Sequence, residues 1–270
     1  ERFNAIIQLN LTALNEGDPK QFIDKSVVVN SNPSRTGTSL PMQSTSTAHH
    51  AIAMTRRFSE FVVSMILLNS PEIDEIVTPK LHLISRSVII LLEKTSREFS
   101  SQEMRDVFLI NNYYLIASSI QTQTSIPISS SSQVDDPRDL PLDYKPTVLD
   151  LFRRKLSDYT IHFVDLEIQI SFPALVEAVR KAFPQIESQS PPIQDGFSEA
   201  ELKDNHTKRM MTISESMVMK FGDFQNGRMI LQMIAKRLVL YWVKFDQLCR
   251  YVIKGSPLWF GNLISTQQLA

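Results

Sequence analysis

The residues best suited to chemistry in this sequence are five histidines and one cysteine. The histidines are His49, His50, His82, His162 and His206. His49 and His50 are adjacent, and adjacent residues do not share a helix face, so they make a poor metal site. Cys249 sits beside an apolar helical stripe without a nearby base, which indicates packing rather than nucleophilic attack. We therefore predict no metal site and no catalytic cysteine.

Short motifs that carry chemistry are absent from the sequence. It contains no phosphate-binding glycine loop, no HExxH or CxxC pattern and no GxSxG nucleophile. The pair Asp135–Asp136 lies in a Ser- and Pro-rich stretch, where it is expected to be solvated. Arg56–Arg57 and Lys236–Arg237 read as solvated helix faces, and Lys208–Arg209 is too short to indicate nucleic acid. No cofactor is expected, and the sequence favours a protein that is not an enzyme.

Composition narrows the class of protein further. The 270 residues carry 28 basic and 29 acidic side chains, a net charge of −1, which gives no basic surface for nucleic acid or membrane. The longest apolar run, Val88–Leu92, is far too short to span a bilayer. A lone cysteine indicates a reducing compartment. Because the chain opens on Glu1, we expect a fragment of a longer protein.

Amphipathic helices account for most of the apolar residues. Apolar residues recur at intervals of three and four residues through the chain, and this period places them on one face of a helix. The two most regular stripes are Leu231, Ile234, Leu238, Tyr241, Phe245, Leu248 and Val252, and Leu149, Phe152, Leu156, Tyr159, Phe163, Leu166 and Ile170. Large apolar and aromatic side chains at this spacing are typical of a helix-bundle core, so both stripes are predicted to be structural.

Two asparagines interrupt the apolar pattern of the segment expected to form a helix over residues 101–120. One possible stripe contains Asn111 and the other contains Asn112. A buried asparagine costs stability unless its amide is hydrogen-bonded, but a bonded one fixes the register of a helix. We expect a structural role for this pair.

The predicted fold class is all-α, with elongated helical bundles that form a rod. Polar, Ser- and Pro-rich stretches separate the helices. We place a linker at residues 30–47 and the main boundary in the stretch after residue 121. The predicted domains are residues 1–145 and a C-terminal helical bundle over 146–270.

Several helical segments carry a family resemblance. AIAMTRRFSE at residues 51–60, VFLINNYYLI at 107–116, SFPALVEAVRKAF at 171–183 and FGDFQNGRMILQ at 221–232 occur in family order. Together they resemble the C-terminal half of the fifty-two-numbered vacuolar-protein-sorting subunit of the Golgi-associated retrograde protein (GARP) complex. The matches are scattered over residues 48 to about 250, and the stretches 30–47, 121–147 and 184–197 lie outside them.

The resemblance implies a non-enzymatic subunit of a vesicle-tethering complex. Such a subunit would capture endosome-derived vesicles at the trans-Golgi network, in retrograde transport. The implied partners are sister helical subunits, a Golgi Rab GTPase and SNAREs. The implied location is the cytoplasmic face of the trans-Golgi network and endosomes, reached through partners. The resemblance carries over no partner-contacting residue.

Two other hypotheses about the function fit the same residues. An all-α ligand- or lipid-binding bundle, or an enzyme, would need an apolar pocket with convergent polar groups. A rod subunit of another tether, such as the exocyst, would share the helical architecture and differ in its sister subunits.

Overall fold

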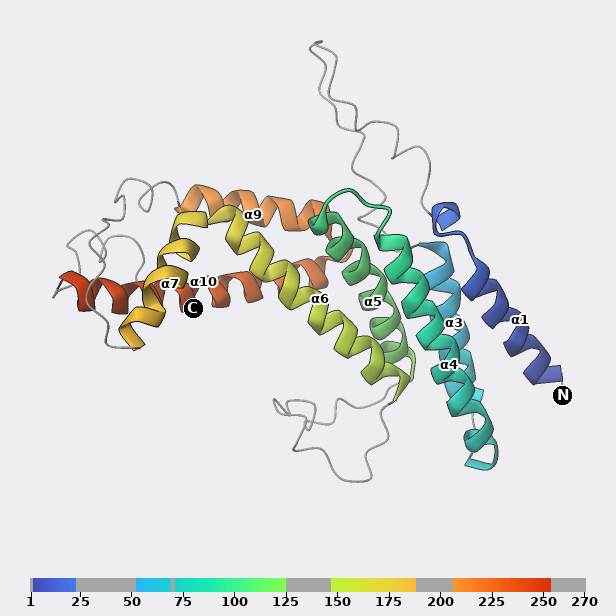
Figure 1. Cartoon of the computed structure of the whole chain (residues 1–270). Coiled ribbons are helices and arrows are strands. Elements are labelled where there is room, and N and C mark those ends of the chain that lie inside the picture. Colours follow the sequence, from blue (N-terminus) through green and yellow to red (C-terminus); the bar gives the residue numbers. More distant parts are fainter. Residues whose placement is uncertain (1, 23–51, 69–70, 125–146, 188–205, 254–270) are drawn as a thin grey trace, which may run out of the picture. The chain divides into compact units, whose positions relative to one another are not determined.

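The computed structural model describes residues 2–22, 52–68, 71–124, 147–187 and 206–253. Throughout these ranges the regular structure is helical, so the predicted all-α class is confirmed (Figure 1). The linker over 30–47 and an expected last helix over 258–268 lie outside the described residues. The rod shape remains a prediction.

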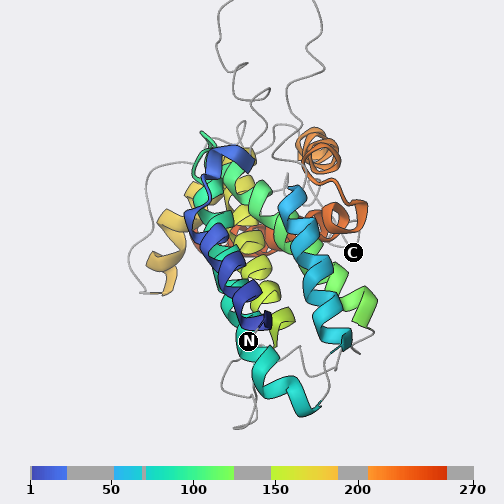
Figure 2. The same ribbon diagram turned by 90° about the vertical axis from the view of Figure 1, so that its right-hand side faces the viewer.

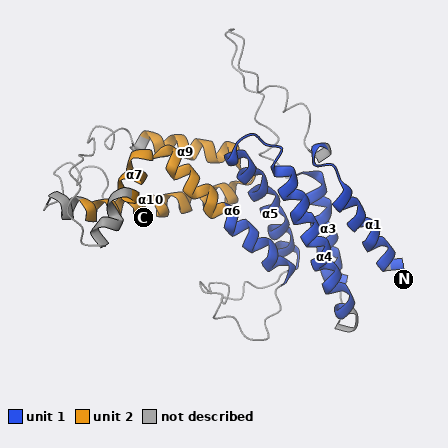
Figure 3. Cartoon of the chain, viewed as in Figure 1, with its two compact units in different colours: residues 1–159 blue, residues 160–270 orange. Residues whose placement is uncertain are grey.

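The chain divides into two compact units (Figure 3). Unit 1 covers residues 1–159 and unit 2 covers residues 160–270. The division falls between Tyr159 and Thr160, inside one helix, whereas the predicted boundary lies in a stretch that the structure does not describe. Domains over 1–145 and 146–270 therefore stay a prediction, and each unit is treated by itself below.

Unit 1 is a helical bundle with α5 at its centre. Its elements are α1 (Arg2–Glu16), the short 3-10 helix η1 (Pro19–Phe22), α3 (Ala53–Leu68), α4 (Pro71–Ser96), α5 (Gln102–Thr124) and the first part of α6 (Val148–Ser171). α3 and α4 both pack against α5, and α1 lies along α4 (Figure 2). Residues 106–113 of α5 are all buried, as expected for a helix that neighbours cover on nearly every side.

Side chains at the helix starts explain where the helices of unit 1 begin. The hydroxyl of Ser101 accepts the backbone N–H of Met104 at 3.1 Å and caps α5. At α6, Thr147 Oγ1 accepts the N–H of Asp150 at 3.2 Å, and Asp150 Oδ2 accepts the N–H of Thr147 at 2.8 Å. This reciprocal pair satisfies two backbone donors that the helix itself leaves unpaired.

Within its described residues, unit 2 contains the second part of α6 and three further helices. These are α7 (Pro173–Glu187), α9 (His206–Lys220) and α10 (Phe224–Ile253). α7 begins at Pro173, because proline suits a first helical position. α9 and α10 form an antiparallel hairpin (Figure 1), whose turn includes Gly222. Asp223 Oδ1 accepts the N–H of Asn226 at 2.9 Å and caps α10.

Candidate functional site

Asn112 occupies the centre of a hydrogen-bonded polar site in unit 1. It is 0% exposed. Its Oδ1 accepts the Thr55 hydroxyl at 2.6 Å and the backbone N–H of Ile52 at 3.1 Å, while its Nδ2 donates to the carbonyl of Phe108 at 2.7 Å. Ile52 directly precedes α3, and its carbonyl accepts the N–H of Thr55 at 3.0 Å. Asn112 therefore fixes the start of α3 on α5.

This geometry accounts for the asparagine that the sequence analysis singled out. The bond to Ile52 satisfies a backbone donor at the N-terminus of α3, where no intrahelical partner exists. Sliding α3 along α5 would break that bond and the Thr55 bond together. The neighbouring Asn111 is also buried, at 7% exposure, because α5 is enclosed on both of the faces that the sequence allowed.

A second polar cluster links α4, α5 and α6 in unit 1. Glu93 Oε1 accepts Lys155 Nζ at 2.7 Å and the Tyr159 hydroxyl at 3.2 Å. The ring of Tyr113 lies 5.9 Å from that of Tyr159. Burial, and then the nearby Glu93 carboxylate, raise the pKa of Tyr159 to about 12. The same two causes, in the same order, raise the pKa of Tyr113.

Both tyrosines are therefore neutral at physiological pH, and neither is poised as a nucleophile or general base. The Glu93–Lys155 pair is partly exposed, with side-chain exposures of 27% and 34%. The cluster is best explained as a link between helices.

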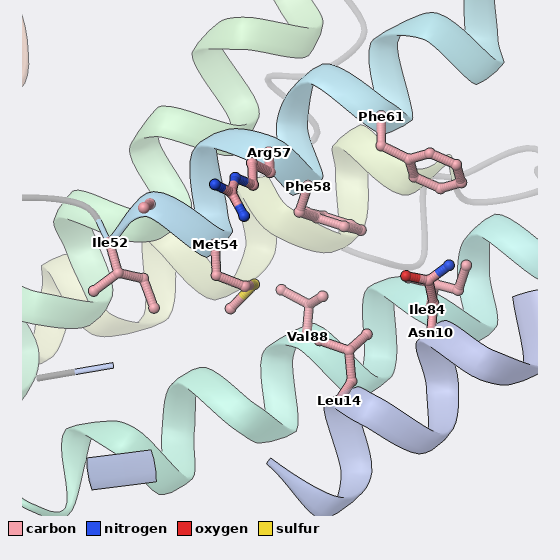
Figure 4. Close-up of a pocket in the computed structure, with 10 residues that line it drawn as sticks. Asn10, Leu14, Ile52, Met54, Arg57, Phe58, Phe61, Ile84 and Val88 are labelled. Atoms are coloured by element: carbon pink, nitrogen blue, oxygen red, sulfur yellow. The ribbon is translucent and has the colours of Figure 1, made fainter. Parts of the chain in front are cut away.

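A pocket of about 540 Å³ lies between α3 on one side and α1 and α4 on the other (Figure 4). Its walls are mainly apolar, with Met54, Phe58 and Phe61 from α3 and Leu14, Ile84 and Val88 from α1 and α4. The guanidinium of Arg57 and the amide of Asn10 add polar groups. Asn10 donates its Nδ2 to the carbonyl of Ile6 at 2.9 Å. The pocket thus combines an apolar interior with one cation.

Unit 2 has its own ion pairs and a more polar pocket. Arg237 makes two bonds to Asp165, at 2.9 and 3.2 Å, and Lys220 Nζ lies 3.0 Å from Glu167. Arg209 donates to the carbonyl of Ser171 at 2.7 Å. A pocket of about 470 Å³ has both Glu167 and Arg209 in its lining. Lys208 lines it as well, so the lining carries charges of both signs.

The predicted stripe residues of α10 lie at two levels of burial. Ile234, Leu238, Phe245 and Leu248 are buried, while Leu231 and Tyr241 are half-buried. Ile230 and Trp242, which the predicted stripe omits, are buried instead. At both places two large apolar residues are adjacent, and the neighbours α7 and α9 decide which one turns inward. The side chain of Val252 lies outside the described part.

The stripe of α6 shows a similar shift. Leu149, Phe152 and Phe163 are buried, and Leu156 and Tyr159 are half-buried. Further along, Ile170 is exposed at 58%, whereas Val164 and Ile168 are buried. The prediction that Ile170 belongs to the core stripe is therefore wrong, because Val164 and Ile168 are the residues that turn inward there.

Residues with metal or nucleophilic chemistry do not assemble into a site in the described part of the chain. No group of three or more His, Cys, Asp or Glu side chains there could hold a metal ion. His82 is half-buried and His162 is exposed. His49, His50 and the side chains of His206 and Cys249 lie outside the described residues. Among the described helices, none is long and apolar enough to cross a membrane.

One family model matches part of the chain. Residues 1–133, just under half of the chain, match the family model described as Vps52, C-terminal. Searches of curated proteins and of solved structures found no match. The matched region contains α1 to α5, and so includes both the Asn112 site and the apolar pocket.

Proposed function

We propose, from the match of residues 1–133 to the Vps52 C-terminal family, that the chain is part of a non-enzymatic subunit of the GARP tethering complex. The family implies such a subunit, and the match over residues 1–133 is the observation that carries the proposal. In this role the protein captures endosome-derived vesicles at the trans-Golgi network. It acts on the cytoplasmic face of that compartment and of endosomes, held there by its partners.

The partners we propose are sister helical subunits, a Golgi Rab GTPase and SNAREs. Exposed apolar side chains on otherwise polar helices support contact with other proteins. Unit 1 exposes Ile76, Leu83 and Ile90 along α4 at intervals of seven residues, which places them on one face. Unit 2 exposes Leu240 and Val243 on α10. These faces are candidates for helix-to-helix contact.

The test is affinity capture of the tagged full-length protein from cells, with mass spectrometry of what is recovered. We expect the three sister subunits of the complex at comparable abundance. A substitution of the α4 face, Leu83→Glu, tests whether that surface contributes, with Arg86→Glu as a matched change on the same helix. Recovery of none of the sister subunits by the wild-type protein would contradict the proposal, and recovery of exocyst subunits would assign the chain to another tether.

A further inference from the structure

The pocket between α3 and the α1–α4 pair has the chemistry of a small-molecule site. Its volume of about 540 Å³ falls within the range of roughly 300–1,000 Å³ that such sites span. Phe58, Ile84 and Val88 are buried, while Met54 and Phe61 are half-buried at its sides. The pocket exists because α3 and α4 both pack against α5 and leave a space between them.

Arg57 sets the charge of this pocket. Among the described residues that line it, Arg57 is the one ionisable side chain. It forms no ion pair within the described part of the chain, and it is exposed. An apolar cavity with one guanidinium at its side suits a ligand with an apolar body and a single carboxylate.

We propose that this pocket binds a single-chain fatty acid. The carboxylate pairs with Arg57, and the hydrocarbon tail lies against Met54, Phe58 and Phe61 on one side and Ile84 and Val88 on the other (Figure 4). Methionine and phenylalanine suit a tail of variable conformation, because the thioether side chain is flexible and the rings supply large apolar surfaces.

The volume favours an extended chain over a helix. A helix with its side chains is about 10 Å in diameter and rises 5.4 Å per turn, so two turns occupy roughly 850 Å³. That exceeds the pocket, so a docked helix of two turns would leave part of its body outside. The inference is independent of the tethering role, since binding can fail while the sister subunits are still captured, and the reverse.

The test is isothermal titration of the full 270-residue chain with dodecanoate and, separately, with dodecan-1-ol, both below their aggregation limits. The variants are Arg57→Gln and, as a matched control, Arg56→Gln, since Arg56 is an exposed neighbour that does not line the pocket. We expect saturable binding of one dodecanoate by the wild type and by R56Q. R57Q should weaken dodecanoate binding about tenfold, equivalent to roughly 1.4 kcal/mol, and leave dodecanol binding unchanged.

A third variant, Met54→Trp, fills the pocket and should weaken the acid and the alcohol alike. Circular dichroism establishes that each variant is folded before titration. The proposal is overturned if folded wild type shows no saturable binding, or if R56Q and R57Q lose affinity equally, which would indicate general charge attraction. It is also overturned if a synthetic acidic amphipathic helix binds in an Arg57-dependent way and dodecanoate does not, because the site would then dock a protein helix.

Discussion

The two units treat buried amides in opposite ways. In unit 1, every polar atom of the Asn112 side chain is bonded to Ile52, Thr55 or Phe108. In unit 2, Asn226 is also 0% exposed, yet neither its Oδ1 nor its Nδ2 has a hydrogen-bond partner within the described residues. A bonded buried amide stabilises one arrangement of two helices, whereas an unbonded one only costs desolvation.

The backbone around Asn226 shows why the site is tight. Gly227 follows it, and a Cβ built on Gly227 would lie 3.4 Å from the carbonyl oxygen of Met217. α9 therefore approaches α10 closely at this point, and the adjacent Asn226 is enclosed as a consequence. At Asn112, unit 1 uses a polar contact to set helix register, whereas at Asn226, unit 2 encloses the amide through close packing of α9 against α10.

The largest loss of stability is expected from truncating a buried leucine in either unit, and the two losses together test whether the two apolar cores are equally well packed. Leu238 in α10 is 1% exposed and Leu109 in α5 is 2% exposed. Leu238→Ala and Leu109→Ala should each lower the free energy of unfolding by roughly 2–5 kcal/mol, measured by urea denaturation. Leu240→Ala, at an exposed position of α10, should cost less than about 0.5 kcal/mol. A loss below about 1 kcal/mol for Leu238→Ala would show that its stripe awaits another partner.

The second-largest loss of stability is expected when the hydrogen-bonded amide of Asn112 in unit 1 is removed. Asn112→Leu should lower the free energy of unfolding by roughly 1–3 kcal/mol, because the Ile52 N–H and the Thr55 hydroxyl lose their acceptor inside the protein. Thr55→Val should cost less, since Asn112 would keep its bond to Ile52. Hydrogen exchange should show faster opening at the start of α3 in Asn112→Leu. A rise in melting temperature would contradict this account.

The matching change in unit 2 should have the opposite sign. Asn226→Leu replaces an amide that has no protein hydrogen-bond partner within the described residues with an apolar group of similar size. We expect the free energy of unfolding to stay level or to rise by up to about 1 kcal/mol. Calorimetry on Asn226→Leu and Asn112→Leu side by side gives the comparison directly. Equal decreases in unfolding free energy in both variants would show that the two amides contribute equally to stability.

The helices and their faces could be predicted because they depend on local period and on turn residues. The restart at Pro173 follows from proline chemistry alone. The exact phase of α10 could not be predicted, since Ile230 and Leu231, and again Tyr241 and Trp242, offer two apolar residues side by side. Which of the two residues is buried depends on the helices packed against α10, and the sequence does not show which helices these are.

The sites show the same limit more strongly. Asn111 and Asn112 could be predicted from the sequence to be polar residues in an apolar segment, each of which needs a hydrogen-bond partner if buried. The partners of Asn112, Ile52 and Thr55, lie 60 and 57 residues away, so their identity could not be predicted. The pocket draws on three helices, and Arg57 looked like part of a solvated face. The local sequence pattern of α3 does not show that a space separates α3 from α4 and forms the pocket.

The smallest expected effect uses the tyrosine cluster of unit 1. Free tyrosine has a pKa near 10, and burial with the Glu93 carboxylate raises the pKa of Tyr159 to about 12. The folded state therefore holds the phenolic proton more tightly than the unfolded state. The stabilisation is fully present below about pH 10 and is lost as the pH rises toward 12. Over that window Tyr159→Phe should lose unfolding free energy less steeply than the wild type, as measured by urea denaturation at each pH.

The pKa of Tyr113 is also raised, so Tyr113 should still make the unfolding free energy of Tyr159→Phe depend on pH. The double variant Tyr113→Phe/Tyr159→Phe should therefore depend on pH less than either single variant. Identical slopes in the wild type and Tyr159→Phe would show that Glu93 and burial do not hold this proton.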